Sequence, residues 1–138
     1  MKQLIKLNVS EDQANKGDCV ARAITKASSI PYYIVHEDLK EWCKRDPRWR
    51  GHPDTGIMDT PDFMRWMVAY GFQRFTPEYA MSLEDIPNIG RYVAFMRGPG
   101  GQHAVAVVDG QVFDSGKQVM KTPRVVEFHL WVGTALSK

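Results

Sequence analysis

The sequence predicts an α+β domain in which helices come first and a small antiparallel sheet follows. Apolar residues recur at helical spacing between residues 19 and 70. Beyond residue 100 the chain instead carries β-branched runs around an Asp-Gly pair, which is typical of a hairpin. No internal repeat, low-complexity tract or linker interrupts the 138 residues, so we expect one domain over residues 1–138.

Three helices are expected in the first half of the chain. The first begins at Cys19, with Asp18 as its N-cap, and ends at Ser28-Ser29. The second covers about 31–44, and the third covers about 61–70 and stops at Gly71. The side chains expected to be buried on these helices are Val20, Ala23, Ile24, Ala27, Tyr33, Val35, Leu39, Trp42, Phe63, Met64, Trp66, Met67 and Tyr70.

Short strands are expected around and after these helices. Residues 2–9 are interpreted as a strand or an extended arm, and residues 45–59 as a loop. The later expected elements are a β-like segment at 72–75, a helical turn at 82–86, a strand at 91–96, a loop at 97–101, a hairpin of 103–108 with 111–114, and a strand at 126–131 with one buried face.

Composition and charge exclude several classes of protein. Lys and Arg total 18 against 16 Asp and Glu, so the net charge of +2 does not favour nucleic acid or an acidic membrane surface as a partner. No apolar run is long enough to span a bilayer, and charges interrupt the N-terminal segment where a signal peptide is apolar, so we expect a cytoplasmic protein. Two cysteines and four scattered histidines predict neither a disulfide scaffold nor a metal site, and we expect no cofactor.

Cys19 is the first candidate for chemistry. A helix N-terminus favours negative charge through its unpaired N–H groups, and the thiolate is the nucleophilic form of cysteine. A buried structural thiol is the alternative interpretation of Cys19 by itself. Gln13 lies six positions upstream, and its side-chain amide is a candidate donor to the oxyanion that forms during acyl transfer.

The hairpin carries the second group of candidates, His103 and Asp114. If Asp109-Gly110 is a two-residue turn, Val105 faces Asp114, and alternation places His103 and Asp114 on the same face of the two strands. A three-residue turn with a bulge would shift the register and could separate them. With this register, the four residues supply a nucleophile, a base, an orienting carboxylate and an oxyanion donor.

These residues resemble those of the papain-like cysteine peptidases. Gln13, Cys19, His103 and Asp114 occur in the order of that superfamily. The string QANKGDCVARA is most similar to the bacteriocin-leader-processing peptidases, and the GDC start with the HAVAVVDG ending resembles small phage and bacterial proteins. The resemblance implies an α+β papain-like fold and a thiol-dependent hydrolase that cleaves a peptide or other amide bond through a thioester. Some papain-like proteins are transferases, deamidases or inactive relatives, so the resemblance leaves the reaction open.

Three alternatives rest on other residues. Cys43 lies late in its helix, where the dipole opposes a thiolate. His52 and Asp54 lie in a loop as a second candidate pair. The basic and aromatic stretch at 42–52 is the basis of the rival hypothesis, a catalytically silent module that binds a protein or nucleic acid. For the enzyme, the expected partner is a peptide or protein substrate.

Overall fold

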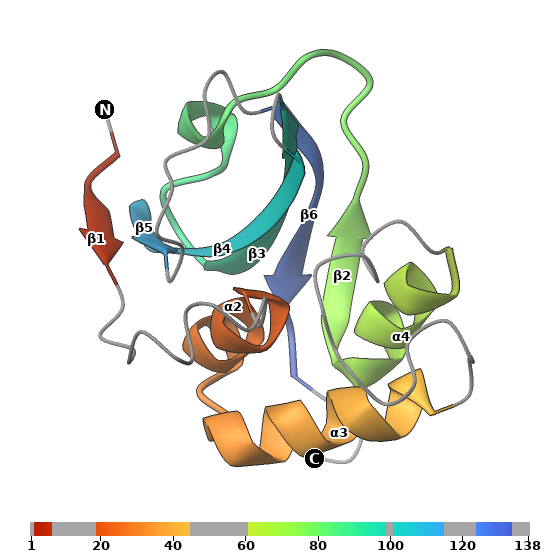
Figure 1. Ribbon diagram of the computed structural model, residues 1–138. Coiled ribbons are helices and arrows are strands. Elements are labelled where there is room, and N and C mark those ends of the chain that lie inside the picture. The colour runs from red at the N-terminus through yellow and green to blue at the C-terminus, as the bar shows by residue number, and fades with distance from the viewer. Residues whose placement is uncertain (1, 7–18, 45–60, 99–100, 115–123, 134–138) are drawn as a thin grey trace.

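A computed structural model describes residues 2–6, 19–44, 61–98, 101–114 and 124–133 of the chain (Figure 1). Within these ranges it contains three α-helices and a six-stranded sheet, which confirms the predicted α+β class. The helices are α2 (Cys19–Ser28), α3 (Tyr32–Cys43) and α4 (Pro61–Tyr70), and a 3-10 turn η2 covers Leu83–Asp85. The strands are β1 (Leu4–Lys6), β2 (Phe72–Phe75), β3 (Arg91–Gly98), β4 (Gly101–Val108), β5 (Gln111–Asp114) and β6 (Arg124–Trp131).

The sheet has the strand order β1-β5-β4-β3-β6-β2. Neighbouring strands from β5 to β2 are antiparallel, but β1 pairs with β5 in parallel, so the sheet is mixed and the prediction of a purely antiparallel sheet is wrong. The difference arises because β1 joins the sheet from the start of the chain, beside a hairpin strand formed near its end. Alternation within a strand does not specify the direction of such a distant partner.

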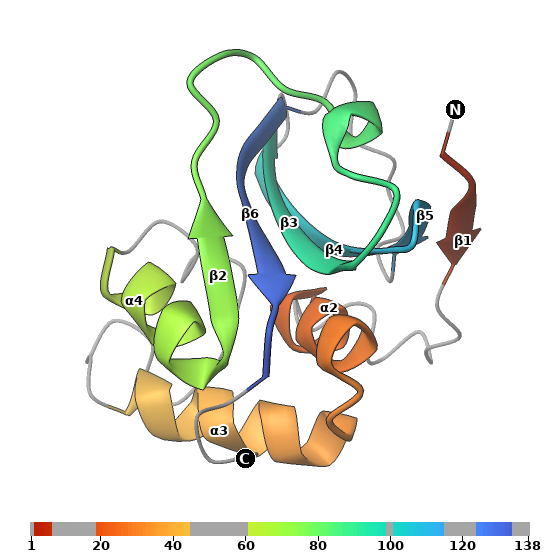
Figure 2. The ribbon, with the colours of Figure 1, turned by 180° about the vertical axis from the view of Figure 1, so that it is seen from behind.

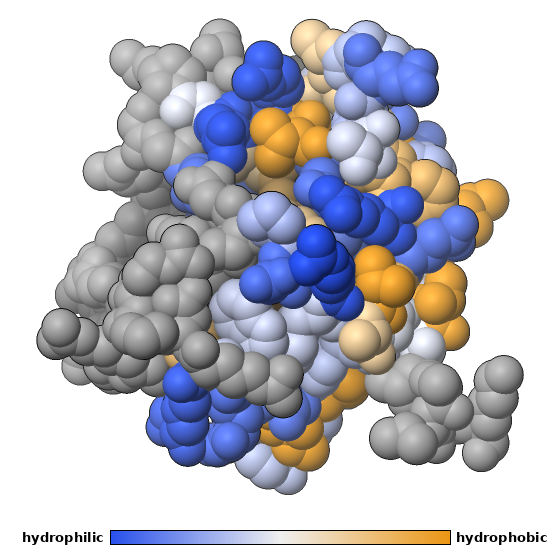
Figure 3. Space-filling model, turned by 90° about the vertical axis from the view of Figure 1, so that its right-hand side faces the viewer, coloured by the Kyte–Doolittle hydropathy of each residue, from blue (hydrophilic) through white to orange (hydrophobic). Residues whose placement is uncertain are grey.

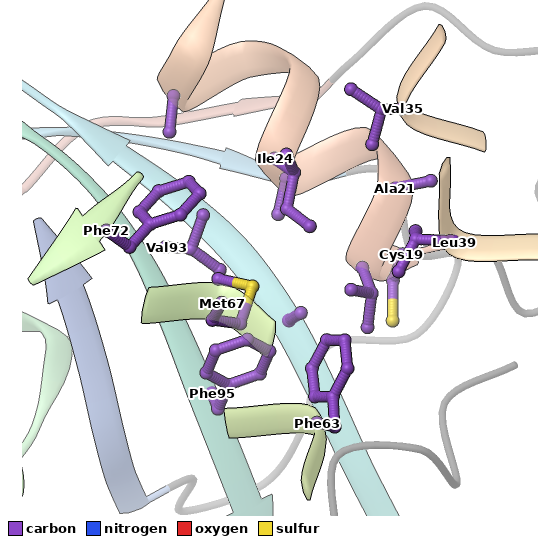
Figure 4. Close-up of a cluster of buried hydrophobic side chains, with 14 of the residues drawn as sticks. Cys19, Ala21, Ile24, Val35, Leu39, Phe63, Met67, Phe72, Val93 and Phe95 are labelled. Carbon is purple, nitrogen blue, oxygen red and sulfur yellow. The ribbon is translucent and has the colours of Figure 1, made fainter. Parts of the chain in front are cut away.

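The three helices gather on one side of the sheet, which is visible from the front and from behind (Figures 1 and 2). Helix α2 contacts β4, β3 and β5, and α3 packs against α2. A cluster of buried side chains fills the space between helices and sheet (Figure 4). Its larger members are Val20, Ile24, Val35, Leu39, Phe63, Met64, Met67, Phe72, Val93 and Phe95.

A second buried cluster lies on the opposite face of the sheet. Alternation along β4 explains both clusters, because Ala104 and Ala106 belong to the first whereas Val105 and Val107 belong to the second. Burial on both faces accounts for the continuous apolar run of this strand. The second cluster is completed by Met81, Ile86, Tyr92, Ala94, Met96, Val112 and Val125.

The ends of several elements differ from the sequence prediction. Strand β3 continues through Gly98 and β4 already begins at Gly101, so the expected loop at 97–101 is shorter, because ladder pairing extends to the last pair, Gly98 with Gly101. Strand β6 begins at Arg124 and is covered on both faces, so the expectation of one buried face is wrong. Tyr33, expected in the core, is 70% exposed because it lies at the start of α3 on the side away from the buried Val35 and Leu39.

Gly71 ends α4 and has a φ of 131°, a left-handed value that suits glycine. A Cβ at this position would lie 2.8 Å from the Trp131 ring and 2.9 Å from the Gly133 backbone. The close approach of β2 to the end of β6 therefore requires this glycine. In the part of the chain that the structure describes, no helix combines the length and hydrophobicity needed to cross a bilayer.

Candidate active site

The hairpin of β4 and β5 turns on Asp109 and Gly110, whose φ values of 47° and 83° are both positive. Two successive positive φ values define the type I′ turn that joins two antiparallel strands tightly. The resulting register pairs Ala106 with Phe113 and Val108 with Gln111, as the two-residue turn predicts. This register confirms the sequence prediction for the hairpin.

His103 and Asp114 lie within hydrogen-bonding distance across this hairpin. The His103 Nε2 and Asp114 Oδ1 atoms are 2.5 Å apart, and the two side chains are 13% and 14% exposed. The prediction that these side chains share a face and meet is therefore confirmed. A carboxylate in this position fixes the imidazole orientation and stabilises its protonated form.

Cys19 is the first residue of α2 and is 6% exposed. Its sulfur points away from the body of the helix in the close-up of the cluster (Figure 4). The Cys19 side chain forms a hydrogen bond with His103, so a single imidazole contacts both the thiol and the Asp114 carboxylate. The structure thus brings together three of the four residues selected from the sequence, and the fourth, Gln13, lies outside the described residues.

The contact between Cys19 and His103 joins residues whose neighbours belong to different buried clusters. Cys19 belongs to the cluster between helices and sheet, whereas Val105, on the same strand face as His103, belongs to the cluster on the opposite face. Strand β5 ends at Asp114, so β4 extends past its partner at His103.

The charge of His103 follows from its two neighbours. Burial by itself lowers the pKa of this imidazole, but hydrogen bonds with Asp114 and Cys19 favour its protonated form and raise the pKa of His103 to about 10. His103 therefore carries a proton at neutral pH. The arrangement places a cation between a carboxylate and a cysteine sulfur.

Two contacts hold α2 in place relative to the strands that carry His103 and Asp114. Arg91 of β3 donates to the Ala27 carbonyl at 3.4 Å and to Ser29 Oγ at 2.8 Å, at the C-terminal end of the helix. A cation there also complements the negative end of the helix dipole. The Lys26 ammonium lies 4.2 Å from the Phe113 ring centroid and so joins the helix to β5.

The alternative candidates have structural roles or fall outside the described residues. Cys43 is the last residue of α3 and is fully buried in the helix–sheet cluster. Trp42 packs edge-on against Phe63 with 5.5 Å between ring centroids, and Lys44 pairs with Glu41 at 2.7 Å. The remaining candidates lie in the undescribed range 45–60, namely Arg45, Arg48, Trp49, Arg50, His52 and Asp54.

A second histidine–carboxylate pair, which sequence reasoning missed, lies on β6. His129 is completely buried, and its Nε2 lies 3.1 Å from Glu127 Oε1. Arg74 of β2 donates two hydrogen bonds to Glu127, both of 2.7 Å. Burial would raise the pKa of Glu127, but the bonds from His129 and Arg74 outweigh it and hold this pKa below its usual value. The sequence signals this pair only through the alternation of Glu127 and His129 with apolar residues, and that alternation by itself predicts polar side chains that face solvent.

Within the described ranges, no three His, Cys, Asp or Glu side chains are grouped as metal ligands would be. No protein-family model matches the sequence, and none of the curated proteins or solved structures compared with it is significantly similar. The function must therefore be inferred from the geometry of Cys19, His103 and Asp114.

Proposed function

We propose that the protein is a papain-like thiol hydrolase that cleaves a peptide or other amide bond. The observation that carries this proposal is the position of His103, which contacts the Cys19 side chain and the Asp114 carboxylate. A thiol, an imidazole and a carboxylate in contact are the parts of a nucleophilic cysteine site. The helix that begins with Cys19 and packs on strands bearing His103 and Asp114 also supports the papain-like assignment.

In the first half of the proposed reaction, the Cys19 thiolate attacks the carbonyl carbon of the substrate. The thiolate is the reactive form of cysteine, and His103 lies beside the Cys19 sulfur. The carbonyl oxygen becomes an oxyanion, for which Gln13 and the Cys19 backbone N–H are the proposed donors. The tetrahedral intermediate then breaks its C–N bond, and His103 gives its proton to the leaving amine.

In the second half, water hydrolyses the thioester. Neutral His103 accepts a proton from the attacking water, whose oxygen bonds to the acyl carbon. Cleavage of the C–S bond releases the carboxylic acid and restores the thiolate beside a protonated His103. Asp114 stabilises the imidazolium at both ends of the cycle and does not take up the proton.

The rival hypothesis is a catalytically silent binding module. Among the described residues, the exposed large apolar side chains are spread over several elements, and only Tyr33 and Ile34 share one, helix α3. These side chains are Leu4, Tyr33, Ile34, Val68, Tyr79, Ile89 and Val132. On the side drawn in Figure 3, hydrophobic surface is likewise divided into small patches by hydrophilic surface. Trp42 and Lys44, from the basic stretch, are engaged in packing and in an ion pair. The described surface therefore favours the enzyme over the module.

Competitive alkylation tests the proposal without a known substrate. With limiting iodoacetamide near pH 6, Cys19 should be labelled at least tenfold faster than Cys43, because Cys19 lies beside a protonated histidine whereas Cys43 is fully buried. Peptide mass spectrometry gives the two rates. The His103→Ala variant should slow labelling of Cys19 and leave Cys43 unchanged.

The matched control is His36→Ala, which removes a histidine that packs against Tyr32 at 5.4 Å on α3. This variant should label like the wild type. A smaller reagent run in parallel separates a narrow entrance from an unreactive sulfur. Equally slow labelling of both cysteines by both reagents, unaffected by His103→Ala, would show that Cys19 is an ordinary thiol. The binding-module hypothesis would then replace the enzyme hypothesis.

A further inference from the structure

A hollow of about 330 Å³ opens between the segment after β2 and the start of β6. Arg124, Val125 and Val126 form one wall. The opposite wall consists of Pro77, Glu78, Tyr79 and Ala80. The volume lies within the range of sites that bind small molecules or single side chains.

The register of the sheet relates this hollow to His103. His103 is paired with Met96 on β3, and Met96 is paired with Val125 on β6. Two strand spacings separate the Cα atoms of His103 and Val125, a distance of about 10 Å. An extended peptide rises about 3.3 Å per residue, so this distance corresponds to about three residues of a bound chain.

The lining of the hollow indicates the kind of side chain that it accepts. Tyr79 is 71% exposed, and the Pro77 ring and the half-buried Val126 add apolar surface. Glu78 and Arg124 contribute one negative and one positive charge, so the lining has no net charge. An aromatic or large aliphatic group gains contact with Tyr79 and Val126, whereas a charged group meets one like and one opposite charge and so gains no net charge attraction.

We infer that this hollow is a specificity subsite that binds an aromatic or large aliphatic substrate side chain about three residues from the scissile bond. The inference rests on the proposed peptidase function, because His103 marks the scissile bond. It identifies the substrate class as peptides with a large uncharged side chain at that separation. Tyr79 and Arg124 are then specificity-determining residues that take no part in the chemical step.

A library of proteome-derived peptides tests the inference. Mass spectrometry of the products gives the residue frequencies on both sides of each bond that is cleaved by wild type and left intact by Cys19→Ala. Aromatic and large aliphatic residues should be enriched at one position about three residues from the bond. In Tyr79→Ala this enrichment should fall, and KM for a preferred peptide should rise about threefold to tenfold with kcat nearly unchanged. Because Tyr79 is exposed, its replacement should leave the fold intact.

Two control variants separate loss of the subsite from a general loss of exposed apolar surface. Tyr79→Phe retains the ring and should restore the preference, whereas Ile89→Ala removes an exposed apolar side chain elsewhere and should have no effect. If Tyr79→Ala and wild type show Cys19-dependent cleavage with the same residue preference, the subsite proposal is overturned and the proposed hydrolase function still stands. Absence of any Cys19-dependent cleavage overturns the peptidase and the subsite together.

Discussion

Two histidine–carboxylate pairs lie in the same sheet, one across β4 and β5 and the other on β6. His103 and Asp114 remain partly exposed, and the imidazole has a cysteine sulfur as its second neighbour. His129 is fully buried beside Phe95 with 5.3 Å between ring centroids, and its carboxylate partner Glu127 is shared with Arg74. The pairs use the same functional groups in different surroundings.

The difference between the two pairs lies in the source of the positive charge beside each carboxylate. At Glu127 the guanidinium of Arg74 supplies a permanent cation, so the carboxylate already has a charge partner without His129. At Asp114 the positive charge comes from His103, whose proton can leave. The arrangement around Glu127 suits a structural clamp between β2 and β6, and the arrangement around Asp114 suits proton transfer.

The largest expected effect concerns turnover. Replacing Asp114 by Ala should lower Cys19-dependent peptide turnover by about two to four orders of magnitude, because the imidazolium loses its stabilising and orienting partner. Glu127→Ala, assayed well below its melting temperature, should retain turnover within about threefold. Full activity in a folded Asp114→Ala variant would contradict an orienting role for Asp114. An equal loss of turnover in Glu127→Ala would contradict the functional contrast between the two histidine–carboxylate pairs.

The next effect concerns stability. Glu127→Gln should lower the free energy of unfolding by about 1–3 kcal/mol, because a half-buried network loses the charge that satisfies Arg74 and His129. Urea denaturation measures the change. Asp62→Asn breaks an exposed ion pair with Arg65 and should cost no more than about 0.5 kcal/mol. Similar losses in both variants would show that Glu127 acts as an ordinary surface charge.

A third effect is in the pH dependence of stability. The pKa of His103 is raised from 6.5 to about 10, so its contribution is fully present below pH 6.5 and is lost as the pH rises toward 10. The pKa of Glu127 is lowered from 4.5, so its contribution is present above pH 4.5 and is lost as the pH falls through the folded-state pKa.

Denaturation of wild type, His103→Ala and Glu127→Gln across the pH range separates the two pairs. The difference between wild type and His103→Ala should shrink toward alkaline pH. The difference between wild type and Glu127→Gln should shrink toward acid pH. If both differences changed at the same end of the range, the assignment of a permanent cation to one pair and a titratable cation to the other would fail.

Local patterns in the sequence predicted the hairpin and the helices. The Asp109-Gly110 pair favours a two-residue turn with positive φ values at both positions. A turn of this length determines which residues of β4 and β5 face each other. His103 and Asp114 could therefore be placed on one face from their sequence positions. The helix beginning at Cys19 followed from the spacing of its buried side chains.

Features that depend on distant pairing could not be predicted in this way. The clamp of Arg74, Glu127 and His129 exists because β2 pairs with β6, and no turn residue joins those two strands. Alternation on β6 separated polar from apolar positions, but it could not show that the polar row is covered. The contact between Cys19 and His103 likewise joins a helix to a distant strand, and only the order of the motif residues predicted it.

The parallel pairing of β1 with β5 has a consequence for the order in which the chain folds. Leu4 lies opposite Val112, so this edge of the sheet can form only once the chain has been synthesised through β5. Closing so long a loop costs more entropy than forming the adjacent β4–β5 hairpin, which needs only a two-residue turn. The hairpin that carries His103 and Asp114 can therefore form before the N-terminal strand and serve as the template to which that strand adds.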